Sequence, residues 1–141
     1  MHVRDAVEAD AERLAVLTGA PQDVMRNLVH DRTVRVGLDG EAESDDPGDA
    51  EDSEDIEGFV SFDAQRDTVH VTQLEGPREA CERLLEEPVR FARGESMAVE
   101  LLVAEGDEET RQAAENVGFV EDGLGPRFGG TRTVRYRWSG D

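Results

Sequence analysis

The sequence predicts a single α/β (α+β) domain over residues 1–141, with a mixed, mostly antiparallel sheet of about six to seven strands flanked by about four helices. Segments such as 33–38 alternate apolar residues with others, which is typical of a half-buried strand. Segments such as 21–30 repeat apolar residues at helical spacing. Short turns join some strands and helices separate others, which indicates hairpins and crossover helices within one sheet.

The first part of the chain is expected to form a strand, two helices and a second strand. Gly19 favours the end of the first helix, and Pro21 favours the start of the second. In the second strand, Val34, Val36 and Leu38 alternate with polar or small residues. The expected elements are strand 1–4, helices 9–18 and 21–30, and strand 33–38.

Residues 41–57 form a low-complexity segment with ten acidic residues in 17 and no basic residue. Pro47 and Gly48 interrupt any regular structure, so a disordered or solvated loop is expected. Calcium binding is the functional alternative, but the segment lacks the ligand spacing of a calcium-binding helix–loop–helix motif. His2 and His30 also lack partners at metal-ligand spacing. No metal site is therefore expected.

The remainder alternates strands and helices. Pro88 is expected to kink or divide the longest helix, in which Cys81, Leu84, Leu85 and Phe91 face inward. The expected elements are strands 58–64 and 68–74, helix 77–93, strand 99–104, a helix from 108 or 110 to 116, a strand from about 119, a link over 123–130, and strand 131–138.

The charge balance is extreme: 34 acidic residues stand against 15 basic ones, all of them Arg, for a net charge of −19. Such a surface repels itself in dilute buffer, whereas molar salt screens the repulsion and carboxylates keep the protein hydrated. The composition indicates a halophilic, acidic protein. Nucleic acids and anionic membranes would be repelled and are not expected as partners. The single Cys81 excludes an internal disulfide, and with no signal or membrane segment a cytoplasmic location is expected.

The element order and three phrases resemble the GNAT superfamily of acyl-CoA-dependent N-acyltransferases, over nearly the whole chain. Residues 3–12 are similar to the family's opening, where an Arg-x-Ala phrase precedes the first helix. Residues 58–62 are similar to its third strand, and the phrase 113–119 carries the Gly118-Phe119 that follows its fourth helix. The chain resembles a haloarchaeal-type member with a degenerate cofactor loop.

The resemblance implies acetyl-CoA as co-substrate. In the family the fourth and fifth strands diverge, and the pantetheine arm lies against the free backbone of the fourth strand. The pyrophosphate lies on the following loop and helix N-terminus, where exposed N–H groups and the helix dipole attract phosphate. The cofactor-binding residues implied here are Thr72, Gln73, Leu74, Gly76, Arg78, Glu79 and Ala80.

The loop departs from the family's pattern. Glu79 and Cys81 stand near the positions of two expected glycines, which elsewhere let the backbone approach phosphate closely. Pro77 removes one N–H donor. Ala114 occupies the place of the tyrosine that often protonates the leaving thiolate. These departures favour a non-catalytic module of the same fold, which would bind a ligand or a protein.

His70 and Glu100 are the candidate catalytic residues, because the resemblance puts them on the fourth and fifth strands beside the cleft, where either could deprotonate an amine. The alternative is that His70 packs on the sheet and Glu100 is a surface acid. Cys81 lies near a helix start, but no Cys-His motif supports a nucleophilic role.

Near the C-terminus Arg127, Arg132, Arg135 and Arg137 form the one local excess of positive charge. They suit an anionic substrate, the cofactor phosphates, or internal ion pairs with the acidic excess. The function expected from these observations is N-acetylation of an amine on a small molecule or peptide. A homodimer is left open.

Overall fold

The computed structural model describes residues 2–38 and 55–140. Most of the predicted acidic loop, residues 41–54, lies outside the described residues. The elements of the described ranges are β1 (His2–Asp5), the 3-10 helix η1 (Glu8–Asp10), α1 (Ala11–Thr18), α2 (Gln22–Asp31), β2 (Thr33–Leu38), β3 (Ile56–Gln65), β4 (Thr68–Glu75), α3 (Arg78–Glu95), β5 (Ala98–Ala104), α4 (Glu108–Val117), β6 (Val120–Phe128) and β7 (Thr131–Trp138). The predicted order of elements is confirmed.

The strands of the described residues form one seven-stranded sheet in the order β1-β2-β3-β4-β5-β7-β6. Neighbouring strands are antiparallel except β4 and β5, which are parallel. A parallel pair needs a crossover, and α3 provides it. The predicted mixed, mostly antiparallel sheet is therefore confirmed.

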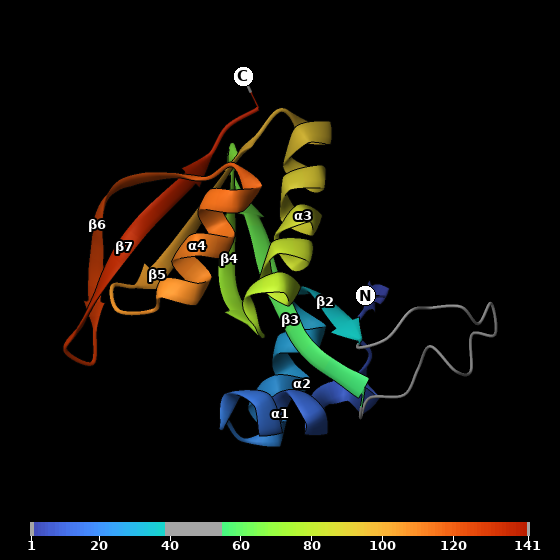
Figure 1. Cartoon of the computed structure of the whole chain (residues 1–141). Helices are drawn as coiled ribbons and strands as arrows, with labels where there is room; N and C mark the ends of the chain where they lie inside the picture. Colours follow the sequence, from blue (N-terminus) through green and yellow to red (C-terminus); the bar gives the residue numbers. More distant parts are fainter. Residues whose placement is uncertain (1, 39–54, 141) are drawn as a thin grey trace.

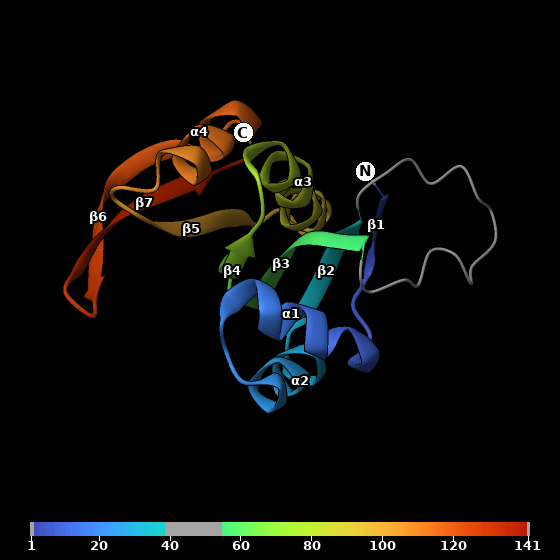
Figure 2. The same ribbon diagram turned by 60° about the horizontal axis from the view of Figure 1, so that its bottom comes forward.

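The helices cover the two faces of the sheet unevenly (Figures 1 and 2). α3 and α4 lie on one face, where Leu84, Leu85 and Ala114 pack against β3, β4, β5 and β7. α1 and α2 lie on the other face, where Leu14 and Met25 pack against β2 and β3. Figure 2 shows none of the described helices below β5, β7 and β6. The face of β5, β7 and β6 opposite α3 and α4 is therefore not covered by any of the described helices.

Four features differ most from the expectation. β3 begins at Ile56, two residues inside the predicted loop, because Ile56 is fully buried and pairs with Leu38. β6 extends through most of the predicted link 123–130, since its pairing with β7 continues to Phe128 and Thr131. α3 continues past Pro88 without division, because its buried residues lie on both sides of the proline and hold both halves on the sheet. Phe91, predicted to face inward, is 43% exposed.

The start of β3 and the turn after β4 are in close backbone contact. A Cβ on Gly58 would overlap the carbonyl oxygen of Glu75, and Gly76 has φ +136°, a backbone conformation that favours glycine. These two glycines allow β3 to approach the turn that leads into α3. The contact fixes where α3 begins relative to the sheet.

The close approach predicts that Gly58→Ala is destabilising. Its Cβ would meet backbone rather than a movable side chain, so we expect a loss of roughly 1–3 kcal/mol in the free energy of unfolding. Gly94→Ala is the matched control, because a Cβ there meets nothing within 4 Å. In helix α3 the control is expected to be neutral or to stabilise by up to about 1 kcal/mol. Urea unfolding of both variants measures the difference, and equal stabilities would contradict the prediction.

Candidate functional site

β4 and β5 diverge at a β-bulge. Their pairing ends at Val71 and Leu101, although both strands continue for several residues. On the other side of β4, Ser61 pairs with Gln73 but its neighbour Phe62 pairs with Val71, which leaves Thr72 as the extra residue. A bulge bends its strand and increases the local twist. From Thr72 onward the edge of β4 that faces β5 is therefore outside the ladder.

Two hydroxyl groups support the bulge. The Thr72 hydroxyl donates to the carbonyl oxygen of Ser61 at 3.1 Å, and the Ser61 and Thr72 hydroxyl oxygens lie 2.7 Å apart. Because the Thr72 hydrogen is used on the carbonyl, the Ser61 hydroxyl supplies the hydrogen between the two side chains. Ser61 is fully buried, so this pairing also satisfies a polar group that water does not reach.

A cavity of about 510 Å³ opens at the divergence, lined by His70, Val71, Thr72, Glu100, Leu102 and Thr133. These residues come from β4, β5 and β7. Val71 and its alternating neighbours on these strands belong to the core under α3 and α4. His70, Glu100 and Leu102 therefore lie on the opposite face, which we call the open face. The two candidate catalytic residues and Thr72 thus line one cavity.

His70 and Glu100 are direct partners in the β4–β5 register. Glu100 faces Arg137 on β7 in turn, and Arg135 lies two residues further along β7, on the same face. A carboxylate oxygen of Glu100 lies 3.6 Å from Nε of Arg135, and the other lies 3.8 Å from a terminal nitrogen of Arg137. Glu100 is thus an ion-pair partner of two guanidinium groups.

The loop after β4 leads into the N-terminus of α3 with no side-chain cap among the described residues. The first intrahelical bond runs from the Cys81 N–H to the Pro77 carbonyl at 2.9 Å, which leaves the N–H groups of Arg78, Glu79 and Ala80 without helical acceptors. Such free N–H groups attract anions. The predicted loop residues therefore lie at a helix start that follows the diverging strand.

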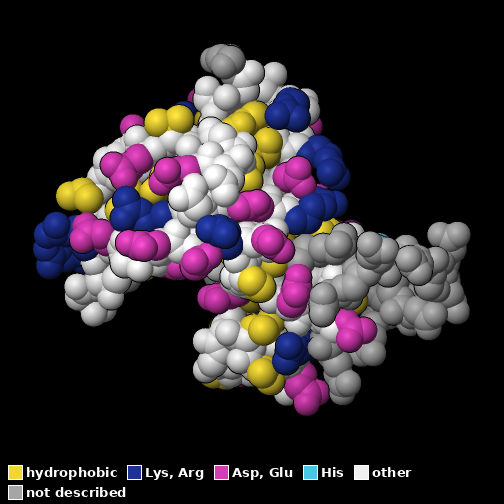
Figure 3. Space-filling model, viewed as in Figure 1, with side chains coloured by type: hydrophobic (Ala, Val, Ile, Leu, Met, Phe, Trp, Pro, Cys, Tyr) yellow, Lys and Arg dark blue, Asp and Glu magenta, His cyan; other side chains and the backbone are white. Residues whose placement is uncertain are grey.

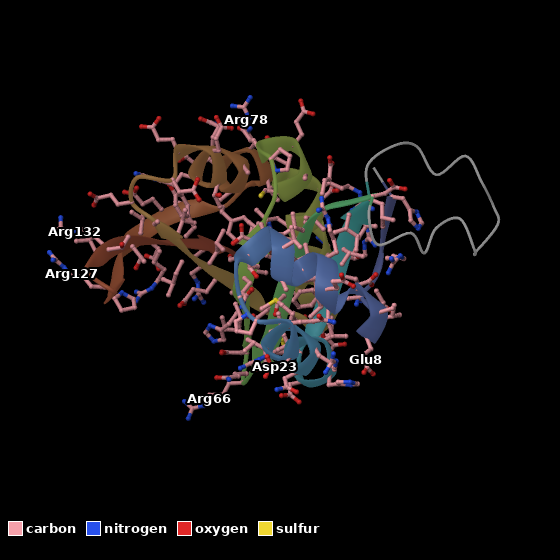
Figure 4. The ribbon with its side chains drawn as sticks, turned by 90° about the horizontal axis from the view of Figure 1, so that it is seen from below. Glu8, Asp23, Arg66, Arg78, Arg127 and Arg132 are labelled. Atoms are coloured by element: carbon pink, nitrogen blue, oxygen red, sulfur yellow. The ribbon has the colours of Figure 1, made fainter. Side chains whose placement is uncertain are left out.

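Acidic side chains surround this helix start. Nε of Arg78 lies 3.7 Å from a carboxylate oxygen of Glu109 on α4, and Figure 4 shows Arg78 pointing outward at the start of α3. Asp107 lies two residues before Glu109 and caps α4: its carboxylate accepts a hydrogen bond from the Thr110 N–H at 3.2 Å. Burial, and secondarily the charge of Asp107, raise the pKa of Glu75 above its usual value. These nearby carboxylates make the start of α3 less favourable for phosphate than a helix N-terminus without acidic neighbours.

Cys81 and Tyr136 are both held in structural contacts. The Cys81 thiol donates to the Gly76 carbonyl at 3.3 Å, and burial, followed by nearby carboxylates, raises its pKa to about 12. A thiol with that pKa is not a nucleophile at neutral pH. Arg111 donates to the buried Tyr136 hydroxyl at 3.0 Å, and that hydroxyl donates to Glu115 at 3.0 Å. Tyr136 therefore joins β7 to α4.

The C-terminal arginines separate into two groups. Arg127 and Arg132 are register partners at the end of the β6–β7 hairpin, and Figure 4 shows both pointing away from the molecule there. Arg135 and Arg137 lie on the open face beside Glu100. The single positive cluster expected from the sequence is therefore two separate features, of which only the second adjoins the cavity.

Sequence reasoning missed the support and the far wall of the cavity. Ser61, Leu102 and Thr133 were not singled out, because hydroxyl and aliphatic residues in strands have no distinctive pattern. The acids of α4 were also missed as neighbours of Arg78, although Asp107 with Thr110 has the spacing of a helix cap. Gln73 and Leu74 lie on the diverging part of β4, as predicted, but neither lines the cavity.

The hydroxyl pair predicts that Thr72→Val weakens the bulge. Valine keeps the shape but leaves the buried Ser61 hydroxyl without its partner, so we expect a loss of roughly 1–3 kcal/mol in the free energy of unfolding. Thr68→Val, at the other end of β4, is the control and is expected to change stability by less than about 0.5 kcal/mol. Unfolding in urea tests the pair, and a Thr72→Val variant as stable as the control would contradict the role assigned to the hydroxyls.

No protein-family model and no curated protein matches the sequence significantly. Solved structures match nearly all of it. Arabidopsis thaliana NAA60 in complex with acetyl-CoA superposes with a TM-score of 0.75 at 16% identity, over 98% of this chain and 97% of that one. The ribosomal-protein-alanine N-acetyltransferase of Brucella melitensis gives 0.72 at 16% identity, over 99% of both chains.

A protein from Desulfovibrio desulfuricans assigned to the GNAT family gives a TM-score of 0.67 at 18% identity, over 98% of both chains. At these identities the likeness concerns the fold. The chain therefore has the GNAT fold, with the divergence of β4 and β5 at the position where the resemblance implied it.

Proposed function

We propose that this chain is an acetyl-CoA-dependent N-acetyltransferase that acts on an amine of a small molecule or peptide. The observation that carries the proposal is the divergence of β4 and β5 at Thr72, with a cavity of about 510 Å³ that contains His70 and Glu100. A thioester arm laid against the unpaired edge of β4 would meet an amine held in that cavity. Acetyl-CoA bound to a protein of similar fold supports the choice of co-substrate.

In the proposed reaction the neutral amine attacks the thioester carbonyl carbon. The new C–N bond forms and the C–S bond breaks, so the acetyl group moves to nitrogen and CoA leaves as a thiolate. Free backbone groups over Thr72–Leu74 hold the arm and polarise its carbonyl, which stabilises the charge that develops on oxygen. The surplus amine proton passes to a base in the cavity, and the thiolate takes a proton from water.

His70 is the proposed base and Glu100 its neighbour. The two residues are register partners on adjacent strands, and both line the cavity. The Glu100 carboxylate is already the ion-pair partner of Arg135 and Arg137, so we assign the role of base to His70 and not to Glu100. His70 has no ion-pair partner within the described ranges, which leaves its imidazole available for the amine proton.

A second candidate is a non-catalytic module of the same fold that binds a ligand or another protein. The ion pair between Arg78 and Glu109 at 3.7 Å favours it, because it occupies the one Arg at the start of α3. Ala114 in place of the thiolate-protonating tyrosine favours it as well. The setting proposed for either function is a salt-rich cytoplasm, where a net charge of −19 is screened.

The first experiment is titration of acetyl-CoA into the chain by calorimetry in roughly 2 M KCl, where charges are screened within a few ångströms. We expect micromolar binding. Glu109→Gln, which releases Arg78, is expected to tighten binding by about twofold at this salt concentration, because a carboxylate near the phosphate is removed but its charge is largely screened. Glu12→Gln, an exposed acid on α1, is the control and should leave affinity unchanged. If the folded protein binds no acetyl-CoA, the non-catalytic module becomes the better explanation of its function.

The role of His70 predicts that His70→Asn lowers kcat by about 10²–10⁴-fold with an amine acceptor, while the affinity for acetyl-CoA stays the same. His30→Asn is the matched control, because His30 is an exposed residue of α2 that lies beside Glu8 and does not line the cavity. The rate at which free CoA thiol is released measures the kcat of both variants. If the two variants have equal rates, His70 is not the base.

A further inference from the structure

Beside the cavity, the open face has a local excess of positive charge. Where the cavity meets β7, the two guanidinium groups of Arg135 and Arg137 share the single carboxylate of Glu100. The nearest acid in the same register row, Asp63 on β3, already pairs with Arg32 at 2.6 Å. The two guanidinium groups and the one carboxylate together have a charge of +1. The chain as a whole has −19.

Arg135 is the member of this group that is least satisfied. Its Nε atom is shielded from solvent and has no hydrogen-bond partner among the described residues. The nearest Glu100 oxygen is 3.6 Å away, beyond the roughly 2.7–3.2 Å of an N–H···O hydrogen bond. A shielded N–H donor without an acceptor is energetically unfavourable. An oxygen atom brought next to Nε would remove that penalty.

Arg135 also adjoins the cavity. It is the register partner of Leu102, which lines the cavity on β5 where that strand has separated from β4. Adjacent strands lie about 4.8 Å apart. The Arg135 guanidinium on β7 is therefore within reach of a small molecule bound in the cavity, at the end of that molecule farther from the divergence of β4 and β5.

From these observations we infer that the acceptor amine carries a carboxylate, which the Arg135 guanidinium binds while the amine lies at the divergence of β4 and β5. Arginine suits this role because its N–H groups match the two oxygens of a carboxylate. A cationic acceptor such as a polyamine would suit the acidic surface elsewhere but would be repelled at this position. The inference rests on the proposed function and specifies its substrate class.

The experiment compares amines that differ only in charge. The acceptors are glycine, β-alanine and 4-aminobutyrate, each matched with its neutral carboxamide, with spermidine as the cationic amine. We expect kcat/KM to be at least about tenfold higher for the best acid than for its amide, since a charge-assisted hydrogen bond is lost. Equal values for acid and amide, or a preference for spermidine, would overturn the inference.

Two variants separate binding by Arg135 from support of Glu100. Arg135→Gln is expected to raise KM for the acid about tenfold and to remove the preference over the amide, with acetyl-CoA affinity unchanged. Glu100→Gln releases Arg135 from its ion pair and is expected to tighten binding of the acid. Arg127→Gln, on the exposed end of the same hairpin, is the control and should have no effect. If Glu100→Gln weakens acid binding as Arg135→Gln does, Arg135 only holds Glu100 and the inference fails.

Binding is also measured without turnover, so that the inference and the proposed function can fail separately. In protein labelled with ¹⁵N-arginine, 4-aminobutyrate is expected to shift the Arg135 Nε–H resonance, which is identified by its loss in Arg135→Gln. 4-Aminobutyramide is expected to leave it unchanged. Absence of acetyl-CoA binding together with this shift would reject the transferase and keep the carboxylate site. Absence of the shift in a protein that binds acetyl-CoA would reject the carboxylate site alone.

Discussion

The extra residue at Thr72 is the constraint on which the rest of the site depends. With one residue more than β3 requires, β4 bends away from β5 after Val71 and Leu101. Separation of two strands inside a sheet leaves backbone donors and acceptors without partners, which is unfavourable unless something binds there. The hydroxyls of Ser61 and Thr72 stabilise the bend from the β3 side. The divergence is thus a built feature of the sheet.

The uneven helical layers determine what can reach this divergence from each face. α3 and α4 cover the core side and bring the α3 N-terminus to the end of β4, through the close contact of Gly58 with Gly76. α1 and α2 stop at β2 and β3, so the opposite side of β5 and β7 keeps its polar residues without a helix above them among the described elements. The start of α3 and the cavity of the open face therefore lie toward opposite sides of the sheet.

The fold could be predicted from the sequence because apolar periodicity and turn residues report directly on strands and helices. Two predictions from local sequence were wrong because packing outweighed the local preference. Pro88 does not divide α3, and the glycines of 123–128 lie within a strand. The candidate site could be predicted only through the resemblance, which led to His70, Glu100 and Thr72. Ser61 and Leu102 could not be selected, and Arg135 was indicated only as one of four C-terminal arginines, since the separate roles of these residues depend on strand register and on a bulge that no local pattern encodes.

Electrostatics links the surface of the chain to the chemistry proposed for it. Figure 3 shows acidic side chains distributed over the face that carries α3 and α4, with Arg side chains interspersed among them. On such a surface an isolated carboxylate ligand would be repelled at most positions, and salt would weaken the few attractive ones. A site that binds an anion there needs arginines partly shielded from solvent, where screening is weaker. Arg135 fits that requirement because its Nε is shielded beside Glu100, whereas the exposed Arg127 and Arg132 do not.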